Sequence, residues 1–190
     1  KIMLKRLDAK VEVNVRINPN EESKNQKVEE FTPESWQIIN LPKSSHIVPS
    51  DEALDLVEDS YFSIGPKNFE TTENEVVNGN ATGGVLHGFS FYTLENKRSG
   101  DAKKSVNGNF HERERRIKNS DGTYNIENGM WEYAPELATY MIIKGELKML
   151  VNPGQTTEQH LIADVTYYIH LGDFAKDKDN YDITRNTNYK

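Results

Sequence analysis

LIADVTYYIHLGDFAKDKDNYDITRNTNYK, residues 161–190, is the stretch that decides the fold. In residues 161–171, every second residue belongs to a more apolar set, which consists of Leu161, Ala163, Val165, Tyr167, Ile169 and Leu171. Successive side chains of a strand point to opposite faces, so the pattern predicts a strand with one buried face. After Gly172 and an acidic loop, a second extended segment is expected over residues 181–185. It runs on to Lys190 without a turn or a cap, which indicates the edge of an incomplete β-domain.

The composition describes a polar chain with a modest core and long polar loops. Of its 190 residues, 35% are hydrophobic, and the formal net charge is −7. Nucleic acid is not expected as a partner, because binding the phosphate backbone relies on clustered Lys and Arg. The dense basic cluster formed by Arg113, Arg115 and Arg116 is interrupted by Glu114. The chain has no cysteine, which excludes disulfides and cysteine-based zinc sites.

Alternating and apolar runs predict further strands upstream of residue 161. They lie at residues 9–17, 31–41, 88–94, 137–143 and 146–151. For residues 31–41 a helix is the alternative, and we favour a strand closed by Pro42. The run at 88–94 is apolar on both sides, which favours an interior strand. Lys144-Gly145 and Pro153-Gly154 are expected as turns, so that residues 137–171 form a three-stranded antiparallel meander.

Polar stretches separate these strands. Residues 20–30 are expected to form a loop or a hairpin tip, and a single short helix of about two turns is predicted to open at Ser50. No strand–helix–strand rhythm runs through the chain. The predicted fold class is therefore mainly β, an antiparallel β-sandwich with long loops and one short helix.

Searches for catalytic patterns indicate that the protein is not an enzyme. His111-Glu112 lacks the second histidine of a zinc-protease helix, and Gly88 opens no complete nucleophile elbow. Neither a Walker loop nor a dinucleotide-binding glycine loop occurs. No catalytic residue, cofactor or metal is predicted.

Two binding alternatives remain open. Asp173, Asp177, Asp179 and Asp182 could supply oxygen ligands to a hard cation, but a solvated acidic loop is the favoured interpretation. Trp36, Trp131 and the tyrosines could instead stack on sugar rings, as in a carbohydrate-binding or adhesin module, although aromatics of a sandwich more often pack in its core.

Five segments taken in order resemble a known family. They are LKRLDAKVEVNV (4–15), SWQIINLP (35–42), FSFYTLEN (89–96), YAPELATYMIIKGEL (133–147) and VTYYIHLGDFAKDKDNYDITRNTNYK (165–190). In this order they are similar to the fimbrillin-like (Mfa-like, DUF4906-type) surface lipoproteins of Bacteroidales, which are related to type V pilus subunits.

The resemblance implies a transthyretin-like sandwich in two parts, an N-terminal β-domain over residues 1–135 and a second β-domain that starts in 136–190. Members continue past the position of Tyr189 with a further strand, so we expect the second domain to be incomplete here. The family is exported and anchored as a lipoprotein through a cysteine that this sequence does not contain. The implied location is the outer-membrane surface or a fimbrium.

The resemblance also implies a non-enzymatic structural or adhesive function. Expected partners are other fimbrial subunits, or the chain itself, joined by β-strand exchange, with a host protein or glycan as a further partner. In such exchange an extended strand of one subunit fills an apolar groove of its neighbour. The residues expected to line the core or this groove are Val11, Val13, Val15, Val165, Tyr167, Ile169 and Ile183.

Overall fold

The computed structural model describes residues 6–15, 26–48, 57–69, 87–98, 103–105, 113–116, 131–175, 177 and 179–190. The elements are β1 (Asp8–Val15), β2 (Gln26–Pro42), η1 (Glu58–Ser60), β3 (Tyr61–Asn68), β4 (His87–Leu94), β5 (Lys103–Ser105), β6 (Arg113–Arg116), β7 (Trp131–Tyr133), β8 (Tyr140–Val151), β9 (Gln159–His170) and β10 (Asn188–Tyr189). Within these residues no helix has the length and apolar character needed to cross a membrane.

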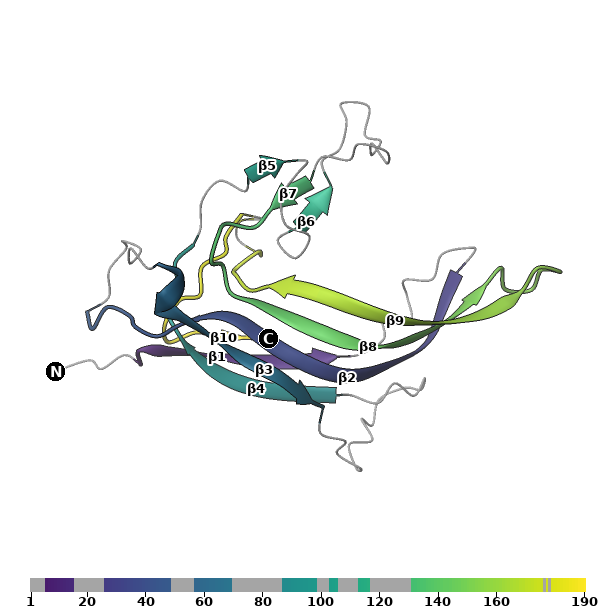
Figure 1. The fold of residues 1–190 in the computed structure, drawn as a ribbon, viewed down its shortest axis with the longest axis horizontal. Coiled ribbons are helices and arrows are strands. Elements are labelled where there is room, and N and C mark those ends of the chain that lie inside the picture. Colours follow the sequence, from purple (N-terminus) through teal and green to yellow (C-terminus); the bar gives the residue numbers. More distant parts are fainter. Residues whose placement is uncertain are drawn as a thin grey trace.

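Two of the sheets build a β-sandwich (Figure 1). One sheet has the order β10-β1-β4, and the other has the order β3-β2-β8-β9. Neighbouring strands are antiparallel except for β1 and β10, which are parallel. The prediction of a mainly β, antiparallel sandwich is therefore confirmed. Strands β5, β7 and β6 form a third, small sheet.

The core lies between the β10-β1-β4 sheet and the β3-β2-β8-β9 sheet. The alternating apolar residues of β1 point into it, as the sequence predicted. The buried side chains of β1 are Ala9, Val11 and Val13. They form one apolar cluster with buried residues of β2, β4 and β8. Trp36 of β2 stacks on Phe89 of β4, with ring centroids 4.0 Å apart and 6° between the ring planes. This stack joins the two sheets across the core.

The strand pairs cross the domain boundary that was predicted at residue 135. β2 pairs with β8 along most of its length, and β1 pairs with β10. The apolar cluster also takes residues from both sides of the boundary. Residues 1–135 and 136–190 therefore do not form two separate β-units among the described strands, because the hydrogen-bonded partners of one range lie in the other.

Two predictions about the central strands are wrong. β2 begins at Gln26, inside the stretch predicted as a loop, because pairing with β8 orders its polar residues. β8 runs straight through Lys144 and Gly145, where a turn was predicted. A Cβ atom on Gly145 would lie 2.4 Å from the carbonyl oxygen of Thr32 and 2.9 Å from the Phe31 ring. The glycine thus permits a close approach of β2 to β8 rather than a change of direction.

Other predictions have mixed outcomes. The strand at 88–94 is present as β4, but it lies at the edge of its sheet rather than in the interior. Residues 181–185 form no strand; Ile183 is buried and pairs with Asn96 through an isolated bridge. The predicted helix that opens at Ser50 lies outside the described residues, apart from its last position, Val57, which is exposed.

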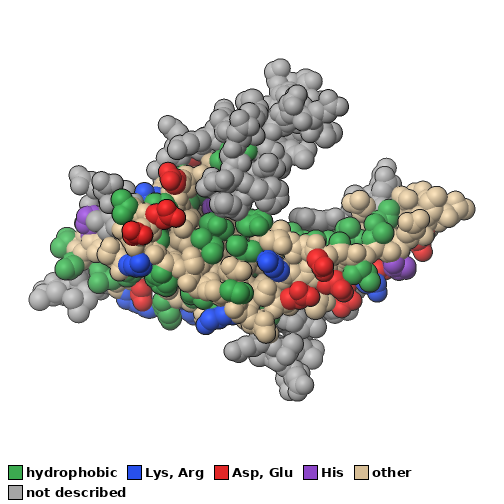
Figure 2. Space-filling view, in the orientation of Figure 1, with side chains coloured by type: hydrophobic (Ala, Val, Ile, Leu, Met, Phe, Trp, Pro, Cys, Tyr) green, Lys and Arg blue, Asp and Glu red, His purple; other side chains and the backbone are tan. Residues whose placement is uncertain are grey.

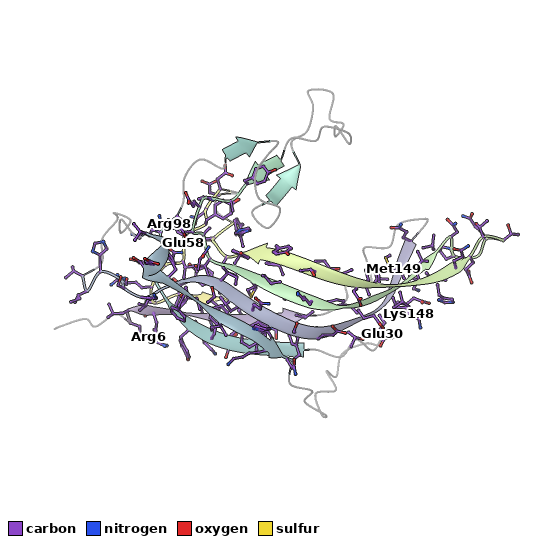
Figure 3. The ribbon with its side chains drawn as sticks, in the orientation of Figure 1. Arg6, Glu30, Glu58, Arg98, Lys148 and Met149 are labelled. Carbon is purple, nitrogen blue, oxygen red and sulfur yellow. The ribbon has the colours of Figure 1, made fainter. Side chains whose placement is uncertain are left out.

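An arm of three strands extends beyond the sandwich (Figures 1 and 3). It is built from the first residues of β2, the end of β8 and the start of β9. Glu30 lies opposite Lys148 in the β2–β8 register, with unlike charges on neighbouring strands. The predicted turn at Pro153-Gly154 closes the arm: Gly154 has φ 74°, and its N–H donates to the Glu158 carboxylate at 2.6 Å.

Candidate strand-pairing edge

β9 is the outermost strand of the four-stranded sheet (Figure 1). It is 12 residues long, and its register with β8 is continuous from Gln159 opposite Val151 to His170 opposite Tyr140. Among the described residues, no strand pairs with its other edge. Within the described part of the chain, β9 is therefore a long sheet edge without a strand beside it.

The backbone direction along this edge follows from one hydrogen bond. The N–H of Leu171, just beyond β9, donates to the carbonyl oxygen of Thr139 at 2.9 Å. In an antiparallel ladder, residues that bond to the neighbour alternate with residues that point away from it. Because the register has no shift, odd-numbered β9 residues bond to β8. Ile162, Asp164 and Thr166 consequently direct their N–H and C=O groups away from β8.

β9 lacks the features with which proteins normally protect a sheet edge. Exposed edges are usually blunted by lysine, proline, bulges or short length. β9 contains neither lysine nor proline, its one formally charged residue is Asp164, and it has no bulge. The opposite edge of the same sheet is protected: β3 carries Pro66 and Lys67, and its register with β2 shifts twice.

The apolar face of β9 is exposed, which contradicts the prediction that it would be buried. Leu161, Tyr167 and Ile169 are 44%, 43% and 40% exposed. This is the core side of the sheet, because Leu171, the next residue on the same face, belongs to the core cluster. The Tyr167 ring meets the Phe31 ring edge-on, with centroids 5.7 Å apart. This face of β9 remains exposed because the β10-β1-β4 sheet, which covers the core side of the other strands, does not reach it.

Hydrophobic side chains consequently reach the surface along β9. Figure 2 shows them along the border of the molecule where β9 runs in Figure 1. On the other face of the strand, Ile162 is 63% exposed. An edge with outward backbone groups and apolar side chains on both faces is suited to adding another strand.

The residues predicted to line the core or a groove separate into two groups. Val11, Val13 and Ile183 are buried in the core, and Val15 packs partly against it. Val165, Tyr167 and Ile169 lie on β9 instead. Their role in strand exchange stays a prediction. Sequence reasoning missed the outward backbone groups of β9, although the near absence of charge in this strand was a usable signal.

A buried ion pair lies away from this edge. Arg185 Nη2 is 3.1 Å from Glu95 Oε1, and both side chains are buried. Burial raises the pKa of Glu95, but the hydrogen bonds from Arg185 and its charge outweigh burial and hold the pKa below its ordinary value. Arg185 also donates to the carbonyl oxygen of His46 at 2.8 Å. The pair thus fastens residues 45–47 to the sandwich, which is a structural task.

The two alternative binding sites gain little from the geometry. In the acidic loop, Asp182 Oδ1 accepts the N–H of Arg98 at 2.6 Å, and Asp177 Oδ1 accepts the N–H of Asp179 at 3.0 Å. No group of three or more possible metal ligands occurs in the described part of the chain. Trp36 is buried in its stack on Phe89, so the proposed sugar platform is wrong for this residue.

The basic cluster and Trp131 lie on short strands of the small third sheet. Residues Arg113–Arg116 form β6, and Trp131 begins β7, but their side chains lie outside those described.

Figure 3 shows Arg98 near Glu58 at one end of the sandwich, where the Arg98 guanidinium donates to the Tyr61 hydroxyl. This contact ties residues 96–98 to the start of β3.

Comparison with protein families gives one result. A model described as a domain of unknown function, DUF4906, matches residues 91–190, which is more than half of the chain and includes the second half of β4 and all of β5 to β10. Searches of curated proteins and of solved structures find no match. The chain belongs to the DUF4906 family.

Proposed function

We propose that this protein is a non-enzymatic structural or adhesive protein of the cell surface, similar to a fimbrial subunit, which assembles through β-strand exchange. The observation that carries the proposal is the 12-residue edge of β9, with outward backbone groups and exposed apolar side chains. The expected partners are other subunits of the same assembly or further copies of this chain.

An added strand would pair with the outward backbone groups of β9 and cover its exposed apolar side chains. Each hydrogen bond made with Ile162, Asp164 or Thr166 contributes about 0.5–1.5 kcal/mol net, because water already solvates these groups. Association itself costs about 4–15 kcal/mol in lost translational and rotational freedom. Hydrogen bonds alone therefore leave little surplus. Covering the exposed parts of Leu161 and Tyr167 supplies the additional stabilisation, so edge and apolar face act together.

The test is a proline on the edge. Thr166→Pro removes an N–H that points away from β8, and proline is tolerated at such edge positions. The variant should fold and reach the cell surface but should no longer enter surface assemblies, as followed by immunogold electron microscopy and by unheated gels of surface fractions. Glu136→Ala, at an exposed turn residue, is the control and should assemble as the wild type does. Normal assembly of Thr166→Pro would refute the proposal.

A carbohydrate-binding module is not proposed as a second function. The sequence offered two tryptophans for it, and Trp36 is occupied in the core. A glycan array probed with the whole chain provides the decisive comparison. Binding that is lost in Trp131→Ala but retained in Thr166→Pro would favour sugar recognition over assembly at β9.

A further inference from the structure

We propose that two copies of this chain pair through β9 in an antiparallel arrangement about a twofold axis at Val165, joining the two four-stranded sheets into one continuous sheet. The proposal rests on the proposed function, since both use the β9 edge, and it deepens that function by naming a second copy as the partner. The pattern of residues along β9 and the direction of its backbone point to this arrangement.

The backbone limits the possible registers. Even-numbered residues of β9 carry the outward N–H and C=O groups, so even-numbered residues of the two copies must face each other. The twofold axis must then pass through a residue position. Near the centre of the strand, the choices are Ala163, Asp164, Val165 and Thr166.

The side chains select among these registers. An axis at Asp164 sets this carboxylate against its own copy, and like charges directly opposite destabilise a sheet. An axis at Ala163 sets Asp164 against apolar Ile162 of the other copy. An axis at Thr166 sets Asp164 against Tyr168 and shortens the overlap. None of these three arrangements gives the carboxylate a suitable neighbour.

With the axis at Val165, Asp164 meets a suitable neighbour. Asp164 lies opposite the Thr166 hydroxyl, which can donate to the carboxylate, and this pair occurs twice. Between Leu161 and Ile169 the remaining pairs are apolar or aromatic: Val165 with Val165, Ala163 with Tyr167, Leu161 with Ile169, and Ile162 with Tyr168. This axis also lies near the middle of Gln159–His170, so the pairing extends along the strand from Leu161 to Ile169. The strand is complementary to itself, which is why we assign the edge to a second copy.

The absence of native cysteine makes disulfide trapping specific. Odd-numbered residues form the non-hydrogen-bonded pairs of the new ladder, so Val165 and its copy have Cα atoms about 4.5 Å apart, within reach of a disulfide. Val165→Cys should therefore link to itself under mild oxidation and separate again when reduced. Ala163 and its copy are about 13 Å apart, four residues along the strand, so Ala163→Cys should form no disulfide link.

A mixture of two cysteine variants provides the matched control for the register. Tyr167→Cys alone should also form no disulfide link, but an equal mixture of Ala163→Cys and Tyr167→Cys should yield a linked heterodimer, because these residues face each other. Self-linking of Ala163→Cys without Val165→Cys would overturn the register. No linking by Val165→Cys, or ladders of higher oligomers instead of dimers, would overturn the dimer.

A charge pair at one position provides a second test without cysteine. Thr166→Lys places a cation opposite Asp164 twice, and Thr166→Asp places a like charge there. Sedimentation equilibrium should show the dimer dissociation constant falling for the lysine variant and rising for the aspartate variant, each by between about twofold and thirtyfold. Lysine normally blunts an exposed edge, so a weaker lysine dimer would contradict the register.

The two proposals can fail separately. If Val165→Cys does not link while Thr166→Pro still abolishes surface assembly, the dimer is refuted and the proposed function stands. If Thr166→Pro assembles as the wild type does, the proposed function is refuted, whichever cysteine variants link in solution.

Discussion

Replacing Glu95 with alanine should destabilise the fold by about 3 kcal/mol. The Glu95 and Arg185 side chains are only 7% and 5% exposed. Two hydrogen bonds join them, from Nη2 to Oε1 at 3.1 Å and from Nε to Oε2 at 3.2 Å. Removing one partner of a buried pair typically costs about 3–5 kcal/mol, because an uncompensated charge stays in the interior.

The lower end of this range applies for a structural reason. After the substitution, Arg185 still donates to the carbonyl oxygen of His46 at 2.8 Å and to the Ser45 hydroxyl at 3.1 Å. These acceptors partly solvate the orphaned guanidinium. For a chain of this size, a loss of about 3 kcal/mol lowers Tm by roughly 6–12 °C.

Urea unfolding followed by tryptophan fluorescence measures the effect, with buried Trp36 as one reporter. Glu136→Ala, an exposed carboxylate, is the matched control and should stay within about 0.5 kcal/mol of the wild type. Arg185→Met and the double variant complete a thermodynamic cycle. A loss below about 1 kcal/mol for Glu95→Ala, or additive effects in the double variant, would refute the reasoning.

Three further outcomes are expected. The folded pKa of Glu95 lies below its unfolded value of about 4.3, so the carboxylate's contribution to stability is present above about pH 4.3 and is lost as the pH falls through the folded pKa. The stability difference between wild type and Glu95→Gln, measured by urea titrations in acid, should therefore shrink as the pH falls below about 4.3. A difference that stays constant with pH would contradict the cause given. Gly172→Ala should destabilise more than Gly154→Ala, as compared by Tm, since its Cβ would lie 1.9 Å from a backbone carbonyl oxygen whereas Gly154 needs only its φ of 74°. Ile38→Ala should cost about 2–5 kcal/mol and Ile162→Ala less than about 0.5 kcal/mol in chemical unfolding, because the first side chain is fully buried and the second is 63% exposed; equal losses would place the core elsewhere.

Local patterns in the sequence predicted the strands well where side chains decide the structure. The alternation of Val11 and Val13 with polar residues matches their burial in β1. The strand at 31–41 was favoured over a helix, and it is the centre of β2. Its polar beginning was missed, because backbone pairing with β8 rather than side-chain burial holds that part.

Exposure of β9 could not be predicted from its alternation. The pattern from Leu161 to Leu171 is that of a half-buried strand, but burial depends on what covers the face, and the covering sheet stops short of it. Gly145 illustrates a second limit. Lys144-Gly145 reads as a turn in the sequence, whereas the glycine serves a close approach of two strands that are distant along the chain. The exposed edge of β9 thus depends on the tertiary arrangement, and only the low number of charged residues in the strand can be recognised from the local sequence.

The parallel pairing of β1 with β10 determines how the molecule would bear tension. Lys10 lies opposite Asn188, and Val11 lies opposite Tyr189. The Lys10 N–H donates to the carbonyl oxygen of Thr187 at 3.0 Å, and the Asn186 N–H donates to the carbonyl oxygen of Asp8 at 2.7 Å. Because the two strands point the same way, a pull that draws the start of β1 and the end of β10 apart acts along the strands in opposite directions. The bonds between them are then strained together, in shear, instead of opening one after another. A protein pulled at these two strand ends gains resistance to stretching from this one short contact.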